Sequence, residues 1–476
     1  MARMPAAIAL VGAILAVSCT VVSADADTEA LTVFEGGSLT SSTELSLGFL
    51  YGAGSRPDGL GTAVSTMNAG VASVCGNPAG LAFVGQSAIL LDVLPPLSAS
   101  ASDIIDVQSR ANTALDDALE SVAHPDLVPV YPTIDAQAGQ HSGVISGAFA
   151  VRLGPAVVGG SIEEPLSLGL NFVDTGIQAF GETVTGEEGG GDVDVDVRAT
   201  LEAAVDLSTQ VDKTTVAAGI EALPGVGLGA SVSAYRASAS ISGHALGDGI
   251  INYGGTEYAF NDPSDPWMND LDQTVDGSFA GTAVGWTAGA SWRPAEWVTL
   301  DLCYTHVPTL TLEGSLTTVS HALPAMGDDG FDAGEISASQ PTLTEREETV
   351  SDSPVELRLP SYAAAAATFR TGRILTTVEV RHYDSDLGFA YEDYEEGIHL
   401  GTGAGLQLTL GGFRLGGGVV MAELTGESVD EGESTSILIP MANMGLGFEV
   451  GGGFRVDTLL LAVPMQVMRV SVGYEF

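Results

Sequence analysis

Carboxylates are the side chains from which this chain could most readily build a binding site. They gather in three acidic clusters, and calcium prefers carboxylate oxygens as ligands. The clusters are Asp262, Asp265, Asp270 and Asp272; Asp328, Asp329, Asp332 and Glu335; and Glu392, Asp393, Glu395 and Glu396. None has the spacing of a calcium-loop motif, so solvated loop charge is the simpler interpretation and no metal site is predicted.

Motifs for catalysis are missing from the sequence. The chain contains no Gly-x-Ser-x-Gly, and none of its seven histidines forms a His-x-x-x-His or Cys/His ligand pattern. His141 and His306 stand as isolated polar positions. The sequence therefore predicts a protein that is not an enzyme and that has no cofactor.

The net charge limits the classes of molecule that the chain can bind. The chain has 61 acidic and 16 basic residues, a formal net charge of −45, and Lys213 is its only lysine. Nucleic acid is excluded as a general partner because its phosphates would be repelled. Acidic solvated loops are the simplest explanation, and a cation-selective lumen or loops that hold calcium are the alternatives.

The sequence predicts that β-strands position the polar side chains described above. The strand pattern is clearest at the end of the chain. Residues 466–476 alternate between an apolar and a polar set with period 2. The apolar set is Met468, Val470, Val472, Tyr474 and Phe476. An unpaired half-apolar strand invites aggregation, whereas pairing with a first strand near Ser87 would close a barrel. Lipid outside and a polar lumen inside then explain the alternation, with a soluble sandwich as the alternative.

Similar segments recur along the chain, and they predict an all-β, transmembrane antiparallel barrel of about 14 strands. The predicted strands are 87–94, 143–153, 156–172, 193–208, 213–222, 226–241, 278–292, 296–306, 355–369, 373–383, 399–410, 413–424, 437–450 and 466–476, with 453–463 as a strand or part of a hairpin. Tight turns are expected at 371–372, 411–412 and 451–453, and long acidic loops at 242–277, 319–354, 384–398 and 425–436. Short turns on one side and long loops on the other are typical of outer-membrane barrels.

The segment before the barrel has a different character. Residues 1–24 have a basic start, a short apolar run and a small-residue cleavage site, which predicts a secretory signal peptide. Residues 25–86 are predicted to form an N-terminal segment and plug, irregular over 25–47 and rich in glycine over 48–86. Residues 87–476 are assigned to the barrel. A helix is indicated over 101–122, and a Cys75–Cys303 disulfide is possible.

Two motifs in the plug segment resemble a known family. Residues 52–63 read GAGSRPDGLGTA and residues 77–82 read NPAGLA, similar to the N-terminal region of the FadL superfamily of fatty acid and aromatic hydrocarbon transporters. Residues 284–289, 357–362 and 474–476 also look like these transporters, and the form that contains Arg56 resembles the PorV-like branch. The resemblance implies a 14-stranded outer-membrane barrel with an inward-folded hatch that includes Arg56, Asn77, Pro78, Gly80 and Leu81.

The same resemblance implies passive uptake of hydrophobic small molecules, either long-chain fatty acids or neutral hydrocarbons, by a barrel surrounded by outer-membrane lipids. Ligands of these transporters leave sideways through a gap at a kinked strand. The candidates for binding a fatty acid carboxylate are Arg152, Arg236, Arg358 and Arg381, although basic residues are scarce. The alternatives are a PorV-like barrel that binds or shuttles a secreted protein, and a purely structural envelope barrel.

Overall fold

The fold is known from a computed structural model of the chain. It describes residues 31–34, 37–46, 70–100, 133–140, 142–186, 192–253, 255–259, 271–321, 326–327, 330–331, 347–351, 354–359, 361–383, 388–391, 394–395, 397–410, 412–427, 434–462 and 467–476. The signal segment, Arg56 and the helix expected over 101–122 lie outside the described residues. In the described part no helix is long and apolar enough to cross a membrane.

The last strand of the chain pairs with the first predicted barrel strand. Strand β26 (Val467–Glu475) lies antiparallel to β3 (Ala88–Leu94) on one edge and to β25 (Phe454–Ala462) on the other. The amide of Phe476 also donates to the carbonyl of Ser87 at 2.9 Å. The predicted pairing of the two ends is therefore confirmed, and 453–463 contributes a strand of its own.

Antiparallel pairings connect the remaining main strands in chain order. From β3 they continue through β6 (Gly143–Leu153), β7 (Ala156–Gly186), β8 (Asp192–Leu223), β9 (Val226–Tyr253), β11 (Leu271–Ala295), β12 (Val298–His306), β18 (Tyr362–Thr371), β19 (Ile374–Tyr383), β22 (Gly397–Leu410), β23 (Phe413–Glu427) and β24 (Ser434–Val450) to β25 and β26. The described chain is thus almost entirely antiparallel sheet.

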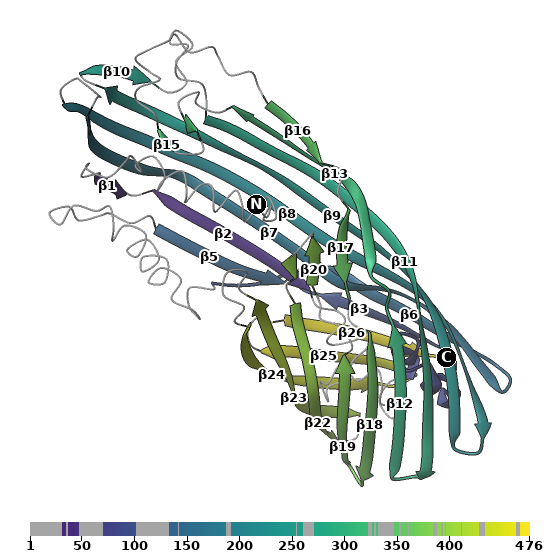
Figure 1. Cartoon of the computed structure of the whole chain (residues 1–476). Helices are drawn as coiled ribbons and strands as arrows, with labels where there is room; N and C mark the ends of the chain where they lie inside the picture. Colours follow the sequence, from purple (N-terminus) through teal and green to yellow (C-terminus); the bar gives the residue numbers. More distant parts are fainter. Residues whose placement is uncertain are drawn as a thin grey trace.

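Tight turns join alternate strands at one end of this sheet, which lies at the lower right of Figure 1. Leu223 pairs with Val226 and Thr371 with Ile374, so each turn contains two residues. Gly225 and Gly372 have φ of 75° and 59°, which glycine adopts without steric cost. Because neighbouring strands are antiparallel, these turns mark a single end of the fold, called the turn end below.

Four strands extend far beyond the others. Strands β7, β8, β9 and β11 contain 31, 32, 28 and 25 residues, whereas β12 contains 9 and β19 contains 10. They form the tall wall on one side of Figure 1. The predicted break between 193–208 and 213–222 is wrong, because the inward and outward alternation continues through Val211 and Asp212. The loop expected over 242–277 is wrong over most of its length, since β9 and β11 occupy much of it.

Shorter strands enlarge the tall wall. Strand β2 (Ser38–Ser46) pairs antiparallel with β7 and parallel with β5 (Thr133–Gln140), so the prediction of irregular chain over 25–47 is wrong there. The predicted strand 355–369 is divided into β17 (Val355–Arg358) and β18. The other short strands are β1 (Leu31–Phe34), β4 (Leu97–Ser100), β10 (Thr256–Ala259), β13 (Leu310–His321), β14 (Met326–Gly327), β15 (Gly330–Phe331), β16 (Glu347–Ser351), β20 (Gly388–Tyr391) and β21 (Tyr394–Glu395).

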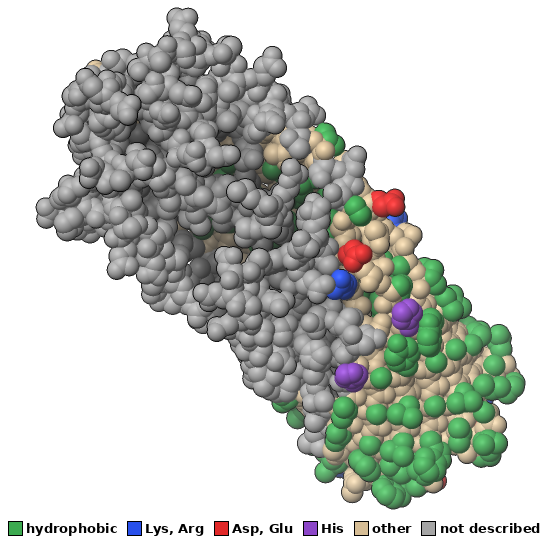
Figure 2. Space-filling view, viewed as in Figure 1, with side chains coloured by type: hydrophobic (Ala, Val, Ile, Leu, Met, Phe, Trp, Pro, Cys, Tyr) green, Lys and Arg blue, Asp and Glu red, His purple; other side chains and the backbone are tan. Residues whose placement is uncertain are grey.

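Burial near the turn end is inverted relative to a water-soluble protein. On β9, Ser231 and Ser233 are 5% and 2% exposed, while Val232 between them is 57% exposed. The buried hydroxyls bond across strands, as between Thr215 and Ser233 at 2.9 Å and between Thr287 and Thr305 at 3.2 Å. This hydroxyl-bearing side is called the inner face. Figure 2 shows hydrophobic side chains gathered on the outside at the turn end. Polar groups therefore face inward and apolar groups outward.

Aromatic rings border the apolar outer band. Near the turn end, Trp297 stacks with Phe369 at 6.5 Å between ring centroids, and Phe413 meets Phe448 at 5.2 Å. Further along the strands, Trp286 lies 5.4 Å from Tyr304. Rings with an apolar body and a polar edge favour such borders between an apolar and an aqueous medium.

Candidate functional site

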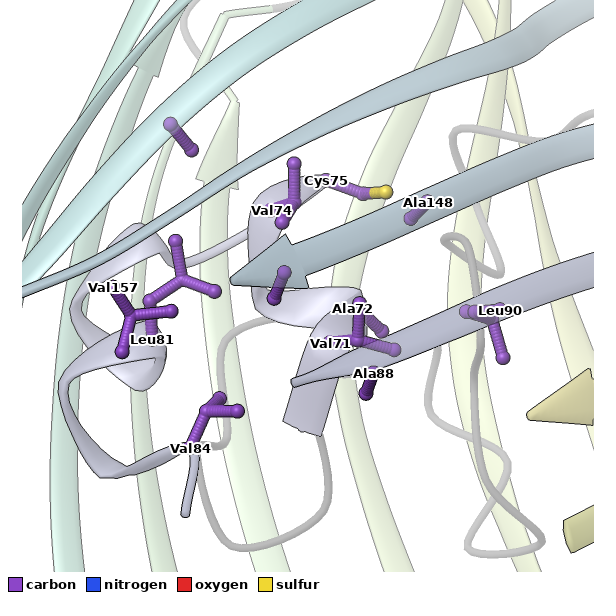
Figure 3. Packing of buried hydrophobic residues seen from close by; sticks show 12 residues of the cluster. Val71, Ala72, Val74, Cys75, Leu81, Val84, Ala88, Leu90, Ala148 and Val157 are labelled. Carbon is purple, nitrogen blue, oxygen red and sulfur yellow. The ribbon is translucent and has the colours of Figure 1, made fainter. Parts of the chain in front are cut away.

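Residues 70–84 form a compact segment that packs on the inner face. They contain two 3-10 helices, η1 (Gly70–Val74) and η2 (Pro78–Phe83). Asn77 caps η2, because its side-chain oxygen accepts from the amide of Ala79 at 3.1 Å, and Pro78 fits the first helical position, where no backbone donor is needed. Figure 3 shows Val74 and Leu81 directed toward residues of the wall such as Val157.

Glycines of the wall make room for this segment. Gly219 of β8 and Gly229 of β9 share the inner face with Thr215 and Ser233, as the period-2 alternation requires. A Cβ atom at either glycine would overlap the carbonyl of Pro78 at less than 3.0 Å. The segment and the wall therefore approach each other to backbone contact, which only glycine permits.

Four contacts with four different strands hold the segment, three of them made by side chains of the strands. Lys213 Nζ of β8 donates to the Cys75 carbonyl at 3.1 Å, and Arg152 Nη1 of β6 donates to the Val84 carbonyl at 2.9 Å. The Arg293 guanidinium of β11 lies 3.7 Å above the centre of the Phe83 ring. The fourth contact joins Asn77 Nδ2 to the carbonyl of Leu302 in β12 at 3.4 Å. Residues 70–84 are thus fixed from β6, β8, β11 and β12.

The pairing of strand β7 is interrupted close to this segment, although the strand itself is continuous. Its pairing with β6 ends at Glu163, its pairing with β2 begins at Ser167, and its register with β8 shifts between Glu163 and Leu166. Pro165 occupies the interruption and has no amide hydrogen to donate to a ladder. Glu163 at its edge faces Lys213, with 3.4 Å between carboxylate and ammonium. The interruption leaves a place in the wall without continuous ladder bonds.

An apolar cluster covers the inner face on the side of the plug segment away from the turn end. The wall contributes Val211, Tyr235 and Ala237 to this cluster, and β13 contributes Leu310 and Leu312. Leu166, Leu357 and Leu359 belong to the same cluster. These side chains bury one another between the wall and β13, so packed apolar groups fill this part of the inner face.

The predicted ligand arginines are not brought together. Arg152 holds the plug segment, Arg236 is exposed with its Cα opposite that of Asp212, and Arg358 pairs with Glu356 at 3.6 Å. Arg381 is paired by register with Ala364, and its side chain lies outside the described part of the structure. Among the predicted plug residues, Asn77, Pro78, Gly80 and Leu81 are all buried in the segment.

Sequence reasoning missed Lys213, Glu163 and Arg293. A signal existed for Lys213, since a single lysine in a chain of 476 residues is unusual. Sequence reasoning also missed a buried network near the turn end, in which Asp457 forms ion pairs with Arg414 at 3.0 Å and with Arg455 at 2.7 Å. Arg455 and Asp457 lie two residues apart on β25, but Arg414 comes from β23, and only the pairing of both strands with β24 brings it to them.

The described cysteines and acidic side chains form neither a disulfide nor a grouped metal site. Cys75 and Cys303 are both buried and free, so the possible disulfide between them is absent. Burial raises the pKa of the Cys75 thiol well above its ordinary value, which makes it a poor nucleophile. Most of the acidic clusters lie outside the described residues, and within the described ranges no three His, Cys, Asp or Glu side chains are grouped to hold a metal ion.

Comparison with solved structures gives fold similarities over most of the chain. The Ralstonia pickettii toluene transporter TbuX is 14% identical and matches 90% of this chain and 99% of its own, with a TM-score of 0.42. A Pseudomonas aeruginosa FadL homologue is 14% identical, with 91% and 98% covered and a TM-score of 0.48. The P. putida toluene transporter TodX is 13% identical, with 90% and 99% covered and a TM-score of 0.48.

No protein-family model matches the chain, and no curated protein matches it.

Proposed function

We propose that the chain is an outer-membrane channel of the FadL superfamily for passive uptake of hydrophobic small molecules. Its signal peptide is residues 1–24, and residues 25–86 contain a hatch. Residues 87–476 form a barrel of about 14 strands in contact with outer-membrane lipids. Residues 70–84 are the described part of the hatch, and their contacts with four strands of the inner face support this assignment.

The inverted burial pattern is the observation that carries the membrane location. On β11 the apolar outer band extends from Trp292 to Val284, both exposed. At about 3.3 Å per residue and a tilt of about 40°, these residues cover roughly 20–25 Å, close to the apolar band of a transmembrane barrel. Aromatic pairs lie near the two ends of this band, with Trp297 beyond Trp292 and Trp286 next to Val284 on the outward face.

The internal surfaces support an apolar cargo. The packed cluster around Tyr235 and Leu312 makes the interior beyond the hatch apolar, which favours an apolar cargo over a charged one. The interruption of β7 at Pro165 provides a lateral exit through the wall, because no continuous ladder crosses it. Cargo therefore reaches the bilayer without passing through the whole hatch.

The arginines favour neutral cargo over fatty acids. Arg152 is engaged by the hatch, Arg358 is paired with Glu356, and Arg236 points away from the inner face. The carboxylate of a buried fatty acid would require a cationic partner, and Arg152 and Arg358 already have partners. Neutral hydrocarbons require no such exchange.

Uptake assays test the proposal directly. Cells with and without the protein are compared for uptake of toluene and of oleic acid, alongside the Arg358→Ala and Arg381→Ala variants. Protein-dependent toluene uptake that both variants retain is the expected result. If neither compound depends on the protein and a secreted protein co-purifies with it, the PorV-like shuttle replaces the transporter.

A further inference from the structure

We propose that Lys213 is a latch that couples the position of the hatch to the interruption in β7. This inference rests on the proposed function, because it concerns how the hatch and the lateral exit act together. It assigns a role in the uptake route to the single lysine of the chain and to Glu163.

The contacts of Lys213 distinguish it from Arg152 and Arg293, the other two wall side chains that hold the hatch. Its ammonium lies between the Cys75 carbonyl, 3.1 Å away, and the Glu163 carboxylate, 3.4 Å away. Arg152 and Arg293 contact the other end of the segment, at Val84 and Phe83. Of the four hatch contacts described above, only that of Lys213 also reaches β7.

Glu163 lies where β7 changes its neighbours. It is the last residue of β7 paired with β6 and the last before the register shift with β8, where its Cα partner is Lys213. Ser161 Oγ donates to the same carboxylate at 2.7 Å and holds it toward the ammonium. A movement of β7 at Pro165 therefore acts first on the carboxylate that neutralises Lys213.

Burial makes this arrangement sensitive to such movement. The side chains of Lys213 and Glu163 are 10% and 12% exposed. An ammonium in this position needs its carboxylate, because an uncompensated buried charge is strongly unfavourable. When the carboxylate moves away, the ammonium follows it or moves toward water. In both cases the Cys75 carbonyl loses its donor and the hatch is released at that point.

Thiol labelling in proteoliposomes tests the latch without any substrate. Cys75 supplies the carbonyl that Lys213 binds, and Cys303 lies against the carbonyl of Gly76, so both thiols report on the hatch. Labelling of each thiol by N-ethylmaleimide is followed by mass spectrometry in Lys213→Met and Glu163→Gln. The matched control is Arg414→Met, which removes a buried cation paired with Asp457 on another part of the wall. Gel mobility before and after heating verifies that each variant is folded.

We expect labelling at least tenfold faster in Lys213→Met and Glu163→Gln, and within twofold of wild type in Arg414→Met. Wild-type labelling rates in both folded test variants would overturn the latch, and so would an equal increase in the control. If Lys213→Met does not fold, Glu163→Gln alone decides the outcome. If the wild-type protein supports no toluene uptake while the variants label at the expected rates, the proposed function is overturned and the latch is not.

A double-mutant cycle tests the coupling itself. Pro165→Ala alters β7 at the interruption without removing any of the four contacts that hold the hatch. It is expected to change the Cys75 labelling rate at least threefold in the wild-type chain and less than 1.5-fold in the Lys213→Met background. Equal effects in both backgrounds would show that β7 and the hatch move independently, and would overturn the proposal.

Discussion

Enlarging the glycines beneath the hatch should displace it, and the size of the change needed follows from the packing. The hatch buries Val71, Val74 and Leu81, which are 5%, 1% and 0% exposed. Burying such a side chain contributes about 1.5–3 kcal/mol, so the three together contribute about 5–9 kcal/mol. Overpacking a tight contact costs about 1–3 kcal/mol. Gly229→Ala adds a Cβ that overlaps the Pro78 and Ala79 backbone, so it should shift the hatch locally at a cost of about 1–3 kcal/mol without releasing it.

Larger changes should open the path. The double variant Gly219→Val/Gly229→Val places bulk under both Pro78 and Leu81, and it should release the hatch. The assay is the rate of small-sugar entry into proteoliposomes, measured beside thermal unfolding. Gly147→Ala is the matched control, because its Cβ would meet no atom closer than 3.9 Å. A folded double variant as impermeable as the wild type would refute the idea that residues 70–84 close the lumen.

Three further predictions test other parts of the fold. Leu302→Arg, in the exposed apolar band, should cost about 2–4 kcal/mol of barrel stability in lipid, whereas Ser240→Arg on the polar part of the tall wall should cost almost nothing; urea unfolding in bilayers measures both. Asp457→Asn should cost about 3–5 kcal/mol because Arg414 and Arg455 lose their shared buried carboxylate, whereas Glu449→Gln, at an exposed partner of Arg414, should cost under about 1 kcal/mol in the same assay. Because burial raises the pKa of Cys75 in the folded state, its contribution to stability is full below the unfolded thiol pKa and falls as pH rises above it; Cys75→Ser should remove that decline in a series of unfolding curves, and an unchanged decline would contradict the assignment.

The strands of the fold could be predicted where one pattern decides them. Alternation in 466–476 indicates both the strand and its two faces, because the side-chain period of a strand is 2. The pairing with β3 followed from the need to remove an open edge. Turn positions such as 371–372 followed from glycine, since positive φ at Gly372 is a local requirement.

Other features depend on contacts between distant residues, which one sequence does not show. The length of β9 was underestimated because polar residues such as Ser242 and His244 resemble a loop, yet their neighbours on β8 and β11 make them strand. Lys213, Glu163 and Cys75 meet only when β7, β8 and the hatch are in place. The ligand arginines were chosen by residue type alone, and type says nothing about the partners that occupy them.

Strands β2 and β3 attach the hatch to the wall, one before it in the sequence and one after it. The chain enters the wall at β2, which ends at Ser46, leaves it for the hatch, and enters it again at β3, which begins at Ala88. A hatch attached at both ends stays at high effective concentration near its binding site on the inner face after it is displaced. Reseating is then an intramolecular event that needs no partner protein and no new synthesis. Under the proposed function, the two attachments would therefore close the route again after each opening.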